Sequence, residues 1–199
     1  MRPLRLLLLF VLLFSTEAAL AASPPVDVID RLHTSLIETM KQADTLGIEG
    51  RYERLQPVLE QSFDFERMIA AAVGSAWTTA SEAERQRLLK AFTDLSIATY
   101  AARFNGYSGE SFETLGERPG PRNTVLVDTR LNRPDGQPVS ITYVMSEKDG
   151  QWRIVDVLLD RSISELAVRR SEYNQILRNG GPDALATTLE KKAAELRAS

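Results

Sequence analysis

The single histidine, His33, is the first residue to consider for chemistry, because catalytic triads and most zinc sites depend on histidine. A hydrolase of the G-x-S-x-G type would also need that motif, and the nearest segment, Gly-Tyr-Ser-Gly at 106–109, has the wrong spacing. One histidine and no cysteine would leave only carboxylates to hold zinc. His33 lies beside Leu32, Leu36 and Ile37, which favours a structural or surface position. The sequence therefore predicts no metal site.

Asp156 is the second candidate, because it interrupts an apolar strand pattern at residues 154–159. One hypothesis makes it the general base of a hydrolase or isomerase that acts on a small apolar substrate. The other hypothesis makes it a carboxylate that accepts backbone or arginine hydrogen bonds and holds the sheet. We favour the structural role, because no second titratable group accompanies Asp156 at a recognisable spacing.

The adjacent arginines Arg169 and Arg170 are the third candidate. They could contact a lipid phosphate or an acidic partner. Most arginine pairs on an exposed helix face are simply solvated, and we favour that interpretation.

The first residues have the pattern of a secretory signal peptide. Arg2 and Arg5 precede an unbroken apolar run at residues 6–14, and Ala19 and Ala21 occupy the positions that a signal peptidase reads. A membrane-spanning helix needs about 20 apolar residues, more than this run supplies. We therefore expect residues 1–21 to be removed and residues 22–199 to form one exported domain.

Composition narrows the possible partners of that domain. Removing Arg2, Arg5 and Glu17 from the 24 basic and 27 acidic residues leaves a net charge of −4. Such a chain has no general electrostatic attraction to nucleic acid or to anionic membranes. Because it has no cysteine, an exported fold must be held by its core without disulfides.

Apolar spacing predicts helices at both ends of the domain. Helical periodicity covers residues 29–40, 51–61 and 64–74, the last with Asp64 as N-cap. A longer helix begins with the capping box of Ser81 and Glu84. Two more follow near the C-terminus, at residues 162–179 and 182–196, the first with a capping box of Ser162 and Glu165.

The period changes to two in the middle of the chain. Strands are predicted at residues 111–117, 125–131, 139–145 and 152–159, with turns at 134–136 and 149–150. We expect an α+β fold: an antiparallel, strongly twisted sheet of about four strands, with the helices before and after it packed on one face.

Three segments together resemble the MlaC family, also called the toluene-tolerance auxiliary family. They are residues 63–68 with Gly74 and Trp77, residues 100–109, and Tyr143 followed by residues 150–157. The order and spacing of these segments extend the resemblance from about residue 26 to 195.

Within that family, residues 163–172 are most similar to the hopanoid-associated HpnM branch. Many relatives have glycine where this chain has Arg161. That difference argues against a tight turn at residues 160–162.

The resemblance implies a periplasmic carrier of phospholipid or hopanoid. Such a carrier would be the soluble component of an inner-membrane ABC transport system with an MCE-domain protein. It would exchange lipid transiently with that system and with an outer-membrane or hopanoid-export partner. It would need no catalytic residue, cofactor or metal.

Bulky apolar residues from helices and strands would either fill the core of such a protein or line a lipid cavity. Periodicity alone favours the core, and the resemblance favours the cavity. The predicted lipid-binding residues on the helical side are Phe65, Met68, Phe92, Leu95, Tyr100 and Phe104, with Tyr107 in the following loop as a cover. On the sheet side they are Val125, Val127, Ile141, Tyr143 and Trp152.

Overall fold

A computed structural model describes residues 24–134 and 136–198. The predicted signal peptide, residues 1–21, lies outside the described residues. Within them, no helix is long and apolar enough to cross a membrane.

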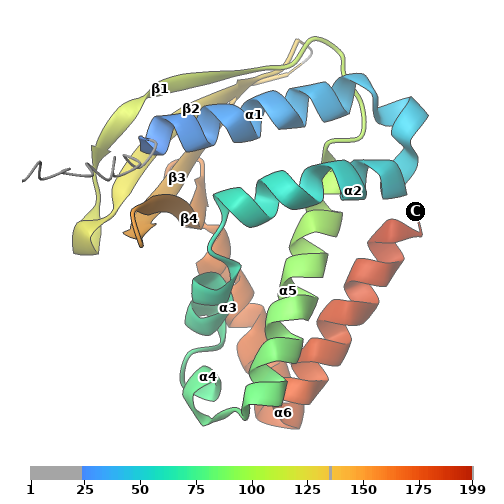
Figure 1. The fold of residues 1–199 in the computed structure, drawn as a ribbon, viewed down its shortest axis with the longest axis vertical. Helices are drawn as coiled ribbons and strands as arrows, with labels where there is room; N and C mark the ends of the chain where they lie inside the picture. Colours follow the sequence, from blue (N-terminus) through green and yellow to red (C-terminus); the bar gives the residue numbers. More distant parts are fainter. Residues whose placement is uncertain (1–23, 135, 199) are drawn as a thin grey trace, which may run out of the picture.

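Five helices precede the sheet (Figure 1). They are α1 (Pro25–Lys41), α2 (Ala43–Ser62), α3 (Phe65–Val73), α4 (Ser75–Thr79) and α5 (Glu82–Arg103). The predicted start signals of α3 and α5 are both present. Asp64 accepts a hydrogen bond from the Arg67 backbone N–H, and Ser81 and Glu84 form the capping box that their spacing predicts.

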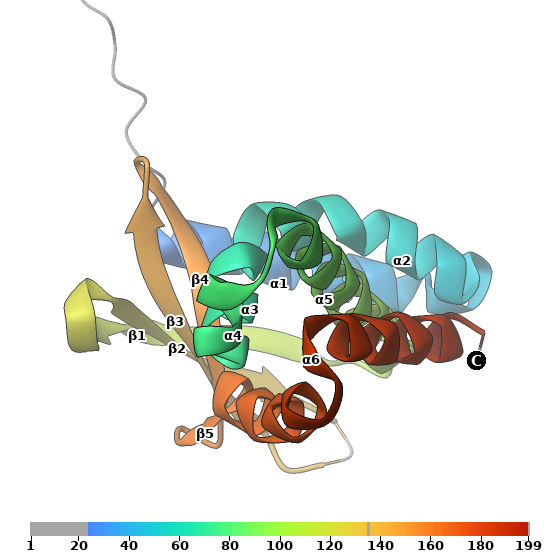
Figure 2. The ribbon, with the colours of Figure 1, turned by 90° about the horizontal axis from the view of Figure 1, so that it is seen from below.

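The sheet is an antiparallel meander of five strands in chain order. It consists of β1 (Ser111–Pro119), β2 (Val125–Asn132), β3 (Val139–Lys148), β4 (Gln151–Leu159) and β5 (Ile163–Ser164), with a 3-10 turn η1 (Pro121–Asn123) between β1 and β2. The α+β prediction is confirmed, although the two-residue strand β5 and the short helix α4 were not predicted. The helices gather on one side of the sheet (Figure 2), where α1, α2, α3 and α6 (Glu165–Arg197) contact it.

Strand β5 also corrects the predicted start of the last helices. Residues 163–164 pair with the end of β4, so the helix begins after them and Ser164, not Ser162, caps it by accepting from the Ala167 N–H. A tight turn at residues 160–162 does form, contrary to the expectation from Arg161. Asp160 and Arg161 both take left-handed backbone angles, with φ of 48° and 66°. Hydrogen bonding on both sides of this hairpin outweighs the cost of that conformation.

Helix α6 contains a break at Gly181, between the two helices predicted at residues 162–179 and 182–196. Gly181 has φ 69° and ψ −168°, so the helical segments before and after it point in different directions. The second segment packs beside α5 (Figure 1), while the first passes the sheet near β4 and β5. The first turns of α6 are thereby placed against the space between helices and sheet.

Candidate functional site

A cavity of about 420 Å³ lies between the helices and the sheet. Its volume is within the range of small-molecule sites, about 300–1,000 Å³. Side chains from α3, α5 and the start of α6 form one wall, and β2, β3 and β4 form the other. The interior is mostly apolar, and charged side chains are confined to a few positions on α5, α6 and the loops.

The helical wall is aromatic. Phe63 stacks on Phe65, with ring centroids 5.4 Å apart, and meets the edge of the Tyr100 ring at 5.8 Å. Tyr100 in turn stacks on Phe104 at 5.7 Å. Cavity-lining positions 92, 96, 99, 100 and 103 recur every three or four residues along α5, so a single face of that helix supplies this part of the wall.

The sheet wall comes from facing pairs on three neighbouring strands. Leu131 pairs with Val139, and Ile141 pairs with Leu159. Because alternate residues of a strand point to the same face, Tyr143 on β3 continues this wall.

Seven of the twelve predicted lipid-binding residues line this cavity: Phe65, Met68, Phe92, Tyr100, Phe104, Ile141 and Tyr143. Their role in binding lipid stays a prediction. The other five lie outside it: Leu95, Tyr107, Val125, Val127 and Trp152.

Each of those five has a physical reason for its position. Val125 and Val127 share a strand face with Leu131, but they lie toward the opposite end of β2. There the inner face of the sheet packs against core side chains instead of lining the cavity. Trp152 is likewise at the far end of β4, and Leu95 is buried between α5 and its neighbours. Tyr107 is 42% exposed, and the Lys41 ammonium lies 5.3 Å from the centre of its ring. Tyr107 thus does not line the cavity in this structure, although Asn105 and Gly106 of its loop do. Its role as a cover over bound lipid stays a prediction.

The sequence analysis missed the charged residues of the cavity. Arg103, Arg133 and Arg169 line it together with Glu110 and Glu165. All five lie at helix ends or in loops, where charged residues are usually solvated. Of these five, only Arg169 was a candidate from the sequence, because it is adjacent to Arg170. The two members of that pair are now separated in role: Arg169 lines the cavity, and exposed Arg170 lies beside Gly74.

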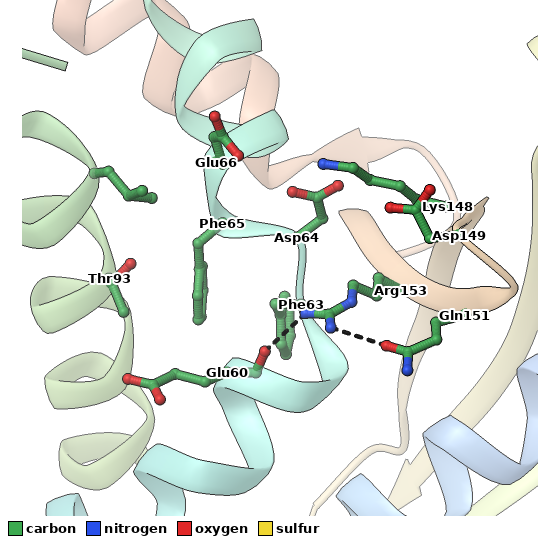
Figure 3. Close-up of a pocket in the computed structure, with 11 residues that line it drawn as sticks. Glu60, Phe63, Asp64, Phe65, Glu66, Thr93, Lys148, Asp149, Gln151 and Arg153 are labelled. Carbon is green, nitrogen blue, oxygen red and sulfur yellow. Dashed lines mark hydrogen bonds between the residues drawn. The ribbon is translucent and has the colours of Figure 1, made fainter. Parts of the chain in front are cut away.

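A second pocket, of about 430 Å³, shares Phe63 and Phe65 with the first but is polar (Figure 3). The Arg153 guanidinium donates there to the Glu60 backbone carbonyl at 3.1 Å and to the Gln151 side-chain oxygen at 3.0 Å. Asp64 is committed to the cap of α3. Because these groups bond to one another, we take the apolar cavity as the candidate site.

Comparison with known proteins identifies the family. A family model described as "MlaC protein" matches residues 30–191. This chain belongs to the MlaC family. It is 22% identical over 188 residues to the intermembrane phospholipid transport system binding protein MlaC of Haemophilus influenzae, an alignment that covers 90% of this chain and 87% of the relative.

A solved structure shares the fold of this MlaC-family chain. It is the phospholipid-binding protein from Ralstonia solanacearum in complex with a phospholipid, with a TM-score of 0.74 and 18% identity. The match covers 85% of this chain and 97% of that chain. The arrangement of helices on a twisted sheet is therefore the one that a phospholipid-binding protein uses.

Asp156 of this MlaC-family chain does not line the cavity. Its carboxylate accepts hydrogen bonds from the Val157 N–H at 2.8 Å, the Ser164 hydroxyl at 2.6 Å and the Leu166 N–H at 3.1 Å. These bonds tie β4 to the first turn of α6, which supports the structural interpretation. A general base for a cavity substrate is not favoured, because the carboxylate is committed to its own backbone.

We expect Asp156→Ala to destabilise the fold by about 3 kcal/mol, on the order of one kcal/mol for each lost hydrogen bond. Asp156→Asn should lose less than half as much and keep any bound lipid, because the amide oxygen preserves an acceptor for the two backbone N–H groups. Urea unfolding of the wild-type protein and both variants measures the difference. Equal stability of the alanine variant and the wild-type protein would contradict the role of this carboxylate.

A buried polar pair lies between α1 and the sheet. His33 on α1 is 5% exposed, and its Nε2 is 3.1 Å from the Tyr143 hydroxyl. The imidazole also stacks on Phe112, with ring centroids 3.9 Å apart. Burial lowers the pKa of His33 to about 4, although Asp30 opposes the shift. The histidine is therefore neutral at pH 7 and has the structural position that its neighbours predict.

Proposed function

We propose that this chain binds a phospholipid or hopanoid in the apolar cavity and carries it through the periplasm. The observation that supports this proposal is the cavity itself, whose aromatic helical wall and aliphatic sheet wall suit lipid tails. Membership of the MlaC family and the names of the two relatives support the same function. In this proposal residues 1–21 direct export and are then removed.

A carrier of this kind solves a specific energetic problem. Each methylene that leaves a membrane for water costs about 0.8 kcal/mol, so a lipid with two long tails crosses an aqueous space extremely slowly. A protein cavity lowers that cost without any chemical step. The proposed protein is accordingly not an enzyme, and it needs no cofactor.

The carrier would work with membrane partners at both ends of its path. In this proposal it is the soluble component of an inner-membrane ABC system with an MCE-domain protein, and it exchanges lipid with an outer-membrane or hopanoid-export partner. The similarity of residues 163–172 to the HpnM branch supports hopanoid as one candidate cargo. That segment includes Glu165 and Arg169, which line the cavity.

Native mass spectrometry of the protein purified from the periplasm of its own bacterium tests this function. We expect a mass above that of the chain alone, lost after organic extraction, and an extracted lipid that is chemically unmodified. A protein that carries no lipid would contradict the proposal. Conversion of an added lipid to a product, abolished by Asp156→Asn, would instead support the hydrolase or isomerase hypothesis.

A further inference from the structure

Three hydrogen-bond donors in the cavity wall have no strong acceptor. Within residues 24–134 and 136–198, neither the Tyr100 hydroxyl nor the Arg103 guanidinium makes a hydrogen bond or ion pair with another residue. Arg169 makes only a long bond, 3.4 Å, to the Tyr173 hydroxyl. The Arg103 side chain is exposed and the Arg169 side chain is half-buried, so both guanidinium groups can meet a polar group of a molecule that enters the cavity.

The two arginines lie close to the tyrosine. Arg103 is three residues after Tyr100 on α5, so the two side chains share a helix face. The Arg169 guanidinium lies 5.4 Å from the centre of the Phe92 ring, on that same face of α5. Burial raises the pKa of Tyr100 to about 12, and the positive charges of Arg103 and Arg169 act against that shift. All three donors therefore converge on one part of the cavity.

Several other arginines of the molecule have carboxylate or carbonyl partners. Arg87 bonds Asp183 and Glu190, and Arg118 bonds Asp128. Arg133, although it also lines the cavity, donates to the Gln137 carbonyl at 2.9 Å. Of the three arginines that line the cavity, Arg103 and Arg169 are therefore the two without a close acceptor in the described parts of the chain.

The nearby carboxylates do not neutralise these two arginines. Glu110 and Glu165 line the same cavity, but neither forms an ion pair with Arg103 or Arg169 in the described parts of the chain. The Glu110 carboxylate accepts the Ser108 backbone N–H at 2.6 Å, and such backbone bonds lower its pKa. The arginines are therefore available to an anion that enters with the cargo.

We propose that Arg103, Arg169 and Tyr100 bind the phosphate of a lipid head group, so that the cavity selects phospholipids over uncharged lipids. The planar fork of a guanidinium matches phosphate oxygens in a two-bond geometry, and two such forks suit a singly charged phosphodiester. The Tyr100 hydroxyl, inward of Arg103 among the aromatic rings, supplies a donor for the ester oxygen next to the phosphate. This inference rests on the proposed lipid-carrier function and specifies its cargo.

The test offers the full exported chain a choice between two lipids with identical tails. Detergent micelles contain equal amounts of phosphatidylglycerol and diacylglycerol, and the protein is then isolated and its lipid quantified by mass spectrometry. The wild-type protein should take up phosphatidylglycerol in at least roughly tenfold excess, the order that one charge-assisted hydrogen bond provides. Arg103→Gln with Arg169→Gln should bring the ratio close to one while total bound lipid changes little.

Matched variants distinguish the charge of the two arginines from the geometry of their guanidinium groups, and both from the general effect of removing an arginine. Arg178→Gln removes an exposed arginine of the same helix as Arg169 that does not line the cavity, and it should leave the ratio unchanged. Lysine at positions 103 and 169 keeps the charge but loses the fork, so it should restore only part of the preference. If the double glutamine variant fails to fold, Arg103→Gln alone decides, because Arg103 is exposed and makes no hydrogen bond or ion pair within the described residues that the substitution could break.

The remaining outcomes would contradict the head-group assignment, the carrier function or both. Lipid binding without preference, or an unchanged ratio in the variants, overturns the head-group assignment and leaves the carrier function intact. Failure of the wild-type protein to take up either lipid overturns both. Glycerol 3-phosphate, which has the phosphate ester but no tails, should not displace bound lipid at millimolar concentration; displacement would mean a site for soluble phosphate esters instead.

Discussion

Leu159→Glu should remove almost all bound lipid from the purified protein. Leu159 is half-buried in β4, pairs with Ile141 and faces the cavity. Lipid tails bound next to an ionised carboxylate would remove its water and provide no hydrogen-bond donor or cation in return. A cost of about 3 kcal/mol, low for an unpaired buried charge, lowers affinity more than a hundredfold. Quantification of lipid per protein by mass spectrometry after purification measures the loss.

Two control variants make that result specific. Leu159→Met keeps a similar apolar volume and should retain lipid. Leu115→Glu places the same charge on β1 at a side chain that is 44% exposed and outside the cavity, so it should also retain lipid. If Leu159→Glu folds with normal circular dichroism and still carries a full complement of lipid, the tails do not lie in this cavity.

The secondary structure was largely predictable because its signals are local. The Ser81–Glu84 capping box and the apolar period of α5 require only neighbouring residues, and both are present. Strand β5 was not predictable in this way. It exists because two residues pair with the end of β4. That pairing depends on a turn in which Arg161 takes a left-handed backbone conformation, which its residue type does not favour.

The cavity was predictable only in part. Alternation of apolar residues shows which face of a strand points inward, but it does not show which residues of that face line the cavity and which are packed in the core. Alternation placed Val127 and Ile141 correctly on the inner face of the sheet. It could not show that the helices pack tightly at one end of that face and stand apart at the other. The β3–β4 register also shifts between Val144 and Met145, so the inward series of β4 changes from Ile154 to Val157. No sequence pattern marks that shift.

The charged lining was missed for a related reason. Arg103 and Arg169 follow apolar helix positions, but arginine near a helix end is ordinarily exposed to water. Their convergence depends on how α5 and α6 pack against each other. All strands of the sheet lie between these two helices in the sequence. Proximity of that kind is a property of the tertiary fold.

His33 leads to the second large effect, a loss of stability in mild acid. In the unfolded chain the imidazole has a pKa of about 6.5, whereas burial lowers the pKa of His33 in the folded protein to about 4. Between these values the unfolded state binds a proton that the folded state does not. Stability from this residue is therefore complete above about pH 6.5 and is lost as the pH falls toward 4. The loss between pH 7.5 and 4.5 should be roughly 2–3 kcal/mol.

The variant His33→Gln isolates this contribution from the carboxylates that titrate in the same range. Glutamine does not ionise and can still bond the Tyr143 hydroxyl. Urea unfolding of both proteins at pH 7.5 and 4.5 should show the wild-type advantage shrinking by that 2–3 kcal/mol at the lower pH. A difference that is independent of pH would mean that His33 titrates normally and is not enclosed as the structure shows. Because the partner of His33, Tyr143, lines the cavity, protonation should also weaken the sheet wall against which the lipid rests.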